Sequence, residues 1–96
     1  MNKHQLVQQI LSKRSYLSTG LDTQIEKLPQ GLERNGKGLM QFNRDIIDAT
    51  KAHSVAYKVN TAFYEQYGKA GWEWMEETVH YLPQETLKIA DAKRGD

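Results

Sequence analysis

The chain has no cysteine and only two prolines among its 96 residues. The absence of cysteine excludes a disulfide framework and thiolate metal sites, and it is compatible with a reducing compartment. Long apolar runs are also absent: no segment has the length needed to cross a membrane, and residues 1–10 lack the apolar core of a secretory signal. We therefore expect a globular protein of the cytoplasm.

An excess of either charge is missing as well, because 13 basic and 12 acidic side chains leave a formal charge of +1. Such a balance gives no electrostatic footprint for a nucleic acid or an anionic membrane surface, so we expect neither as a partner. Hydrophobic residues make up 39% of the chain and charged residues 26%, which is typical of a folded domain rather than a disordered one.

Helix-like and strand-like segments alternate along the chain. Helical spacing of apolar residues predicts helices over about 3–13, 39–52 and 61–81, the last broken near Gly68 and Gly71. Segments of extended character lie at about 16–22, 54–60 and 86–92, and residues 23–38 are expected to form a loop. Strands that alternate with helices of this length predict parallel βαβ units, and so an α/β fold.

Two of these helices are expected to pack on the sheet through particular residues. In the helix over 39–52, the apolar residues Phe42, Ile46 and Ala49 are predicted to line one face. The later helix is expected to pack through three large residues rather than to stack on a nucleic-acid base: Trp72, Trp74 and Met75.

Three strands are too few for a finished parallel sheet, which is normally covered by helices and either closed or extended. The chain also stops directly after its third strand, at Gly95 and Asp96. We therefore expect it to be a truncated part of a larger domain.

The third strand carries two kinds of residue on one face. Leu87, Ile89, Asp91 and Lys93 share that face, because side chains on a strand repeat every two residues. The apolar pair comes first and the charged pair last. This is the arrangement of a barrel strand, in which apolar layers fill the interior and functional groups lie at the C-terminal end.

Charged residues also end the other two strands. Asp22 ends the first, and Lys58 lies near the end of the second, on the face opposite Val55, Tyr57 and Val59. In parallel strands these charges would meet at one edge of the sheet. A solvated rim of ion pairs explains them as well as a catalytic site does, so the residues alone leave both interpretations open.

Four segments of the chain resemble the orotidine 5′-phosphate decarboxylases, in particular their longer bacterial branch. They are Gly20-Leu-Asp22, the run from Phe42 to Thr50, the run from Ala56 to Glu65, and Asp91-Ala-Lys93-Arg-Gly-Asp96, which fits the signature D-x-K-x-x-D. Related sugar-phosphate barrels share that signature, but the four segments together are specific. The resemblance implies a (β/α)8 TIM barrel of roughly 250 residues. Residues 1–96 would be its N-terminal portion, about three β/α units, truncated after the third strand.

The resemblance also implies an activity and the residues that perform it. The family decarboxylates orotidine 5′-phosphate to UMP in de novo pyrimidine biosynthesis, with no metal and no organic cofactor. Lys93 would place its ammonium beside pyrimidine C6, stabilise the carbanion and donate the proton. Asp91 would lie near the departing carboxylate, and Asp96 would reach into the site of the neighbouring subunit. Lys58 would complete the charge network, and Asp22 with Lys58 would bind the ribose hydroxyls.

The resemblance further implies a homodimer with active sites at the subunit interface. The later strands should supply the phosphate-binding and base-recognition groups, so the 96-residue chain alone is expected to be inactive.

Two other functions remain open. One is a related magnesium-dependent barrel such as a hexulose-phosphate synthase, which also uses D-x-K-x-x-D. The other is a non-enzymatic βαβ interaction module, if 96 residues is the true full length. His4, His53 and His80 have no spacing that suggests a metal site, and Asn60 is not assigned a role although it shares a strand face with Lys58.

Overall fold

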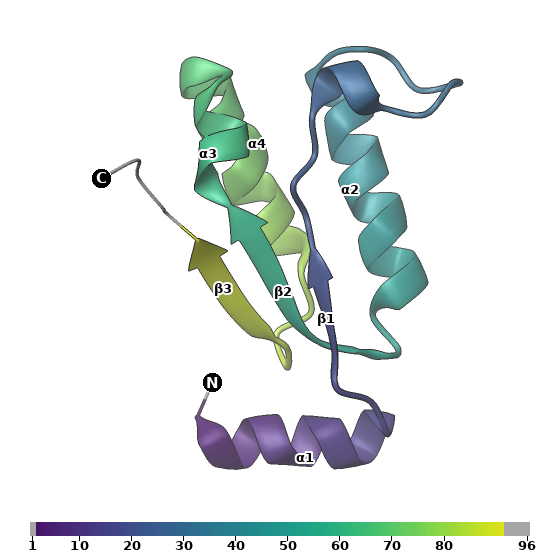
Figure 1. The fold of residues 1–96 in the computed structure, drawn as a ribbon, viewed down its shortest axis with the longest axis vertical. Coiled ribbons are helices and arrows are strands. Elements are labelled where there is room, and N and C mark those ends of the chain that lie inside the picture. The colour runs from purple at the N-terminus through teal and green to yellow at the C-terminus, as the bar shows by residue number, and fades with distance from the viewer. Residues whose placement is uncertain (1, 92–96) are drawn as a thin grey trace.

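The computed structural model describes residues 2–91 of the chain. Helices and strands alternate in it as the sequence predicts (Figure 1). In chain order the elements are α1 (Lys3–Lys13), β1 (Leu17–Gly20), the 3-10 helix η1 (Ile25–Lys27), α2 (Gly36–Thr50), β2 (Ser54–Asn60), α3 (Thr61–Glu65), α4 (Gly68–Tyr81) and β3 (Leu87–Asp91).

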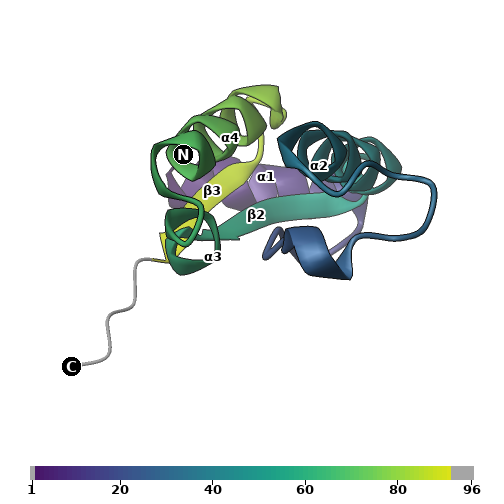
Figure 2. The same cartoon turned by 90° about the horizontal axis from the view of Figure 1, so that it is seen from above.

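The three strands form one parallel sheet in the order β1-β2-β3, which confirms the predicted βαβ arrangement. The chain passes through α2 between β1 and β2, and through α3 and α4 between β2 and β3. Both long helices, α2 and α4, lie on the same face of the sheet and pack against each other (Figure 2). Among residues 2–91, no long helix covers the other face over the C-terminal halves of the strands (Figure 2).

The hydrophobic core lies between this sheet and the helices. From β2, Tyr57 and Val59 point into it, with exposed fractions of 0% and 3%. The hydroxyl of Tyr57 lies 2.8 Å from Thr50 Oγ1, which joins the strand to the last turn of α2. The remaining buried members of the core are Leu21, Leu39, Met40, Ile47, Tyr64 and Leu82.

Helix α2 begins at Gly36, three residues before the predicted start, because Asn35 caps it. The Asn35 side chain accepts a hydrogen bond from the backbone of Gly38 at 3.1 Å. Gly38 also allows a close approach, since a Cβ on it would lie 1.7 Å from the carbonyl oxygen of Glu33. The sequence predicted a loop over Gly36 and Gly38, but both residues lie in the first turn of α2.

The predicted packing faces of the two long helices were partly wrong. Ala49 is exposed, and the buried side of α2 consists of Gly38, Leu39, Met40, Asn43 and Ile47. Asn43, a polar residue, lies at the centre of this buried side. A prediction from apolar positions alone therefore does not find the correct face.

In α4, Trp74 and Met75 pack against the core as expected, whereas Trp72 is 46% exposed. Trp74 contacts Tyr67 with their ring centroids 5.4 Å apart.

Helix α1 forms over the predicted residues and crosses the N-terminal ends of the strands (Figure 1). None of its residues is buried, and Leu11 is 71% exposed. Its last residue ties it to the sheet, since Lys13 Nζ donates to the carbonyl oxygens of Lys51 at 3.0 Å and Ser54 at 2.7 Å. Within residues 2–91, no helix is both long enough and apolar enough to span a membrane.

Candidate active site

The face of the sheet opposite α2 and α4, here called the open face, collects the residues that the sequence singled out. Paired residues in neighbouring parallel strands point to the same side. The register pairs Gly20 with Lys58, Lys58 with Ile89, and Asn60 with Asp91. Lys58 and Asp91 therefore share one face at the C-terminal ends of β2 and β3, while Tyr57 points to the other.

Lys58 and Asp91 form an ion pair across the two strands. Lys58 Nζ lies 3.4 Å from Asp91 Oδ2, and the two side chains are 44% and 14% exposed. A pair this accessible contributes little to folding stability. What it does provide is a cation and an anion held at fixed positions by two neighbouring strands.

The end of β3 is also held by the start of α3. Thr61 Oγ1 donates to the carbonyl oxygen of Asp91 at 3.2 Å, and Thr61 is buried. Asn60 caps α3, because its side chain accepts from the backbone of Ala62 at 3.2 Å. The sequence assigned Asn60 no role, and the structure gives it this capping contact.

Asp22 lies at the same end of the sheet, two residues after the end of β1. The backbone of Leu21 donates to the carbonyl oxygen of Lys58 at 2.9 Å, so contact between the two segments continues beyond the strand. Asp22 is exposed, and its Oδ2 lies 3.9 Å from the position that a Cβ on Gly20 would occupy. The carboxylate is therefore close to Gly20, the strand partner of Lys58.

The structure thus brings Asp22, Lys58 and Asp91 to one end and one face of the sheet. The other two predicted site residues, Lys93 and Asp96, lie outside the described residues.

Beneath this end of the sheet lies a buried polar network that the sequence interpretation missed. Asn43 Nδ2 donates to Tyr64 Oη at 3.1 Å and to Thr78 Oγ1 at 2.9 Å, and Thr23 Oγ1 donates to Asn43 Oδ1. Tyr64 Oη in turn donates to the carbonyl oxygen of Leu21 at 2.9 Å. Among the described residues, no buried side-chain nitrogen or oxygen lacks a hydrogen-bond partner.

The ionisation of Tyr64 responds to this environment. Burial raises the pKa of the Tyr64 hydroxyl above its ordinary value. Hydrogen bonds with Asn43 and Thr23 act in the opposite direction, and the negative charge of Asp22 raises the pKa further. The neutral hydroxyl, which can donate to Leu21, is therefore the favoured form.

One signal in the sequence could have revealed the network. Asn43 lies four residues after Leu39 and four before Ile47, in the middle of an otherwise apolar helical stripe. A polar residue at that spacing faces the core, and a buried polar side chain needs hydrogen-bond partners.

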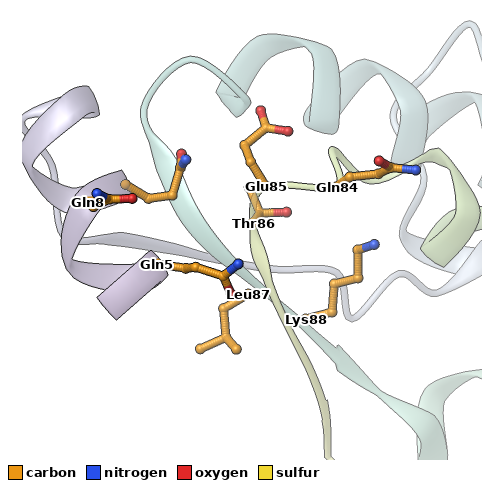
Figure 3. Close-up of a pocket in the computed structure, with 8 residues that line it drawn as sticks. Gln5, Gln8, Gln84, Glu85, Thr86, Leu87 and Lys88 are labelled. Carbon is orange, nitrogen blue, oxygen red and sulfur yellow. The ribbon is translucent and has the colours of Figure 1, made fainter. Parts of the chain in front are cut away.

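A hollow lies at the opposite end of the sheet, between α1 and the start of β3 (Figure 3). It measures about 530 Å³ and has a polar lining that includes Gln5, Gln8, Gln84, Glu85, Thr86 and Lys88. Leu87 begins β3 here and Asp91 ends it, so the hollow and the charged cluster lie at the two ends of the strand. Nowhere in residues 2–91 do three His, Cys, Asp or Glu side chains gather as a metal site would require.

Comparison with known proteins identifies the family. No family model matches the chain. Individual relatives match all of it: the chain is 48% identical to an orotidine 5′-phosphate decarboxylase of Phocaeicola vulgatus and 50% identical to that of Parabacteroides distasonis, in each case over 99 residues. The chain belongs to the orotidine 5′-phosphate decarboxylase family. It spans about a third of the length of these relatives, 36% and 35% respectively.

Solved structures related to this family have the same fold. A Toxoplasma gondii protein assigned as an orotidine-monophosphate decarboxylase superposes with a TM-score of 0.84 at 32% identity, over 97% of this chain and 32% of that one. The orotidine-monophosphate decarboxylase of Leishmania donovani gives 0.74 at 31% identity, over 97% and 33%. The parallel β/α arrangement is therefore that of part of a decarboxylase TIM barrel.

Proposed function

We propose that the complete protein to which this chain belongs decarboxylates orotidine 5′-phosphate to UMP, in de novo pyrimidine biosynthesis. Family membership supports the reaction. The observation that carries the proposal to particular residues is the ion pair between Lys58 and Asp91, at the C-terminal ends of neighbouring parallel strands. In TIM-barrel enzymes this end of the strands holds the active site.

The proposed reaction breaks the bond between pyrimidine C6 and the carboxylate carbon. Carbon dioxide leaves, and the bonding electron pair stays on C6 as a carbanion. Lys93, two residues after Asp91, would hold its ammonium beside C6 and transfer one proton to it. The neutral amine then recovers a proton from water, which restores the enzyme.

Electrostatic stabilisation is the main physical effect in this proposal. A fixed ammonium group stabilises negative charge that develops only along the reaction path, so it lowers the barrier more than it strengthens substrate binding. Asp91 would lie near the departing carboxylate and hold the position of Lys58. Lys58 and Asp22 would bind the ribose hydroxyls, and their location on the open face suits that role.

The same proposal extends to the assembly. Residues 1–96 would be the N-terminal portion of one barrel domain, in a cytoplasmic homodimer in which Asp96 reaches into the neighbouring subunit's site. The later strands would supply the groups that bind the phosphate and the base. We propose no metal and no organic cofactor for the reaction.

Substitution of the proposed proton donor tests the assignment. In the complete protein, Lys93→Ala should reduce kcat for orotidine 5′-phosphate by at least about a thousandfold, which corresponds to about 4 kcal/mol in the barrier. Lys88→Ala is the matched control, since Lys88 is an exposed lysine of β3 that is paired with Tyr57 rather than with Lys58. Its activity should stay close to that of the wild type.

Two outcomes would contradict the proposal. Activity of Lys93→Ala within about tenfold of wild type, a barrier change of only about 1.4 kcal/mol, would show that Lys93 is not the proton donor. Loss of wild-type activity on addition of a chelator would favour the magnesium-dependent barrel chemistry instead.

A further inference from the structure

Asp22 lies between two residues that the core holds in place. Asp22 itself is exposed, whereas Leu21 and Thr23 on either side are only 1% and 6% exposed. The backbone of Leu21 is bonded at both polar atoms: its N–H donates to the Lys58 carbonyl, and its own carbonyl accepts from Tyr64. An exposed carboxylate thus extends from a segment whose neighbours on both sides are fixed.

Asn43 joins the two fixed neighbours of Asp22 to each other. Its side-chain oxygen accepts from Thr23, and one of its amide hydrogens goes to Tyr64, which holds Leu21. Its other amide hydrogen goes to Thr78 in α4. Asn43, Tyr64 and Thr78 are at most 1% exposed, so water cannot replace a lost partner.

Core packing alone does not require this arrangement. A buried helix face can be filled by apolar side chains, as Leu39 and Ile47 fill it one turn before and one turn after Asn43. The polar bonds of Asn43 instead converge on the two residues that flank Asp22. A network of directional bonds fixes the position of a backbone segment more closely than apolar contacts do.

We propose that Thr23, Asn43 and Tyr64 form a positioning network that holds the Asp22 carboxylate in place for substrate. This inference rests on the proposed function, because it takes Asp22 as the group that binds the ribose. The three residues act through Asp22 and do not touch the substrate themselves. Loss of the network should therefore weaken substrate binding while the chemical step continues.

Thr23→Val in the complete protein tests the network, because valine keeps the shape of threonine and has a methyl group in place of the hydroxyl. We expect KM for orotidine 5′-phosphate to rise about five- to tenfold, with kcat within about threefold of wild type. Thr23→Ser keeps the hydroxyl and should restore KM to within about twofold. Thr78→Val is the matched control: it removes another hydroxyl bonded to Asn43, but one that lies in α4 and not beside Asp22.

A double-mutant cycle separates positioning from general destabilisation. In an Asp22→Ala background the network has no carboxylate to hold, so Thr23→Val should change KM by less than about twofold. If Thr23→Val raises KM equally in both backgrounds, or if Thr78→Val raises it as much as Thr23→Val, the positioning proposal is wrong.

Hydrogen exchange of the backbone amides supplies a readout that does not depend on activity. Thr23→Val should speed exchange at residues 21–23 by about tenfold relative to Thr78→Val, and unchanged exchange there would overturn the proposal. A wild-type protein without decarboxylase activity would instead refute the proposed function. The exchange result would then still decide whether the network holds this segment.

Discussion

Tyr57 and Lys58 are neighbours in β2, but their side chains enter different environments. Tyr57 is 0% exposed and packs among the core residues beneath the helices. Lys58 points to the open face, has a side chain that is 44% exposed, and pairs with Asp91. The alternation of a strand therefore places a packing residue and a charged residue one peptide bond apart.

Polar groups are treated differently on the two sides. On the helix-covered side the buried groups Asn43 and Tyr64 are neutral, and their polar atoms are hydrogen-bonded. On the open face Lys58 and Asp22 are charged, and solvent reaches both side chains. Charge is tolerated where water can still solvate it, whereas a buried group needs a partner for every donor. We therefore expect folding stability to depend mainly on the covered face, and the proposed activity to depend mainly on the open face.

The largest effect on stability is expected from truncation of the covered face. Tyr57→Ala in the complete protein should lower the free energy of unfolding by about 3–5 kcal/mol, because it leaves a cavity under α2 and removes the hydroxyl bonded to Thr50. Lys58→Ala, one residue further, should lower it by about 1 kcal/mol or less. Urea unfolding of both variants measures these free energies. Equal decreases for Tyr57→Ala and Lys58→Ala would show that the two faces contribute equally to stability.

Gly71 and Gly20 allow the same comparison with a smaller expected effect, because each substitution to alanine adds only one methyl group. A Cβ on Gly71 would lie 1.8 Å from the backbone carbonyl oxygen of Tyr64, where α4 passes close to α3, so Gly71→Ala must push the two helices apart. We expect it to cost about 2–3 kcal/mol of stability. A Cβ on Gly20 would meet nothing nearer than Asp22 Oδ2 at 3.9 Å.

Gly20→Ala should accordingly change the free energy of unfolding by less than about 1 kcal/mol. Because its methyl group would lie beside Asp22, it should act mainly on KM for the substrate. Thermal unfolding and steady-state kinetics of the two alanine variants measure both quantities. A Gly20→Ala protein as unstable as Gly71→Ala would contradict the separation of the faces.

The sequence correctly predicted the strand in which apolar and polar residues alternate. The bounds of β2 agree with the predicted 54–60, because its apolar and polar residues alternate and its covered face is apolar. The parallel order of the strands is likewise confirmed. The meeting of Lys58 and Asp91 followed from the same reasoning, since charges at the ends of neighbouring parallel strands lie at one edge.

Two of the failures arise from features that apolar patterning does not capture: a buried polar side chain and a helix cap. The predicted face of α2 was built from apolar residues alone, so it left out the buried Asn43 and included Ala49, which is exposed. Gly36 was read as loop because glycine is a poor helix former, but Asn35 supplies a cap that the pattern did not weigh. Neither the cap nor the network can be found by counting apolar positions.

Alkaline pH should reveal the smallest effect, and it connects the covered side with Asp22. The pKa of Tyr64 is raised above its ordinary value of 10.0, first by burial and also by the charge of Asp22. Below pH 10 the hydroxyl is protonated in both folded and unfolded chains, so its contribution to stability is fully present. Above pH 10 the unfolded chain ionises first, and stability falls as the pH rises toward the folded pKa.

Tyr64→Phe should remove this part of the alkaline loss, which can amount to at most about 1.4 kcal/mol per pH unit. Tyr16→Phe is the matched control, because Tyr16 is 83% exposed. Urea unfolding at pH 8 and near pH 11 should show a smaller decrease for Tyr64→Phe than for the wild type or Tyr16→Phe. Equal decreases in all three proteins would mean that Tyr64 ionises as readily in the folded protein as in the unfolded chain. In that case the network beneath Asp22 would not be closed to solvent, and the contrast between a dry covered side and a solvated open face would fail at this end of the sheet.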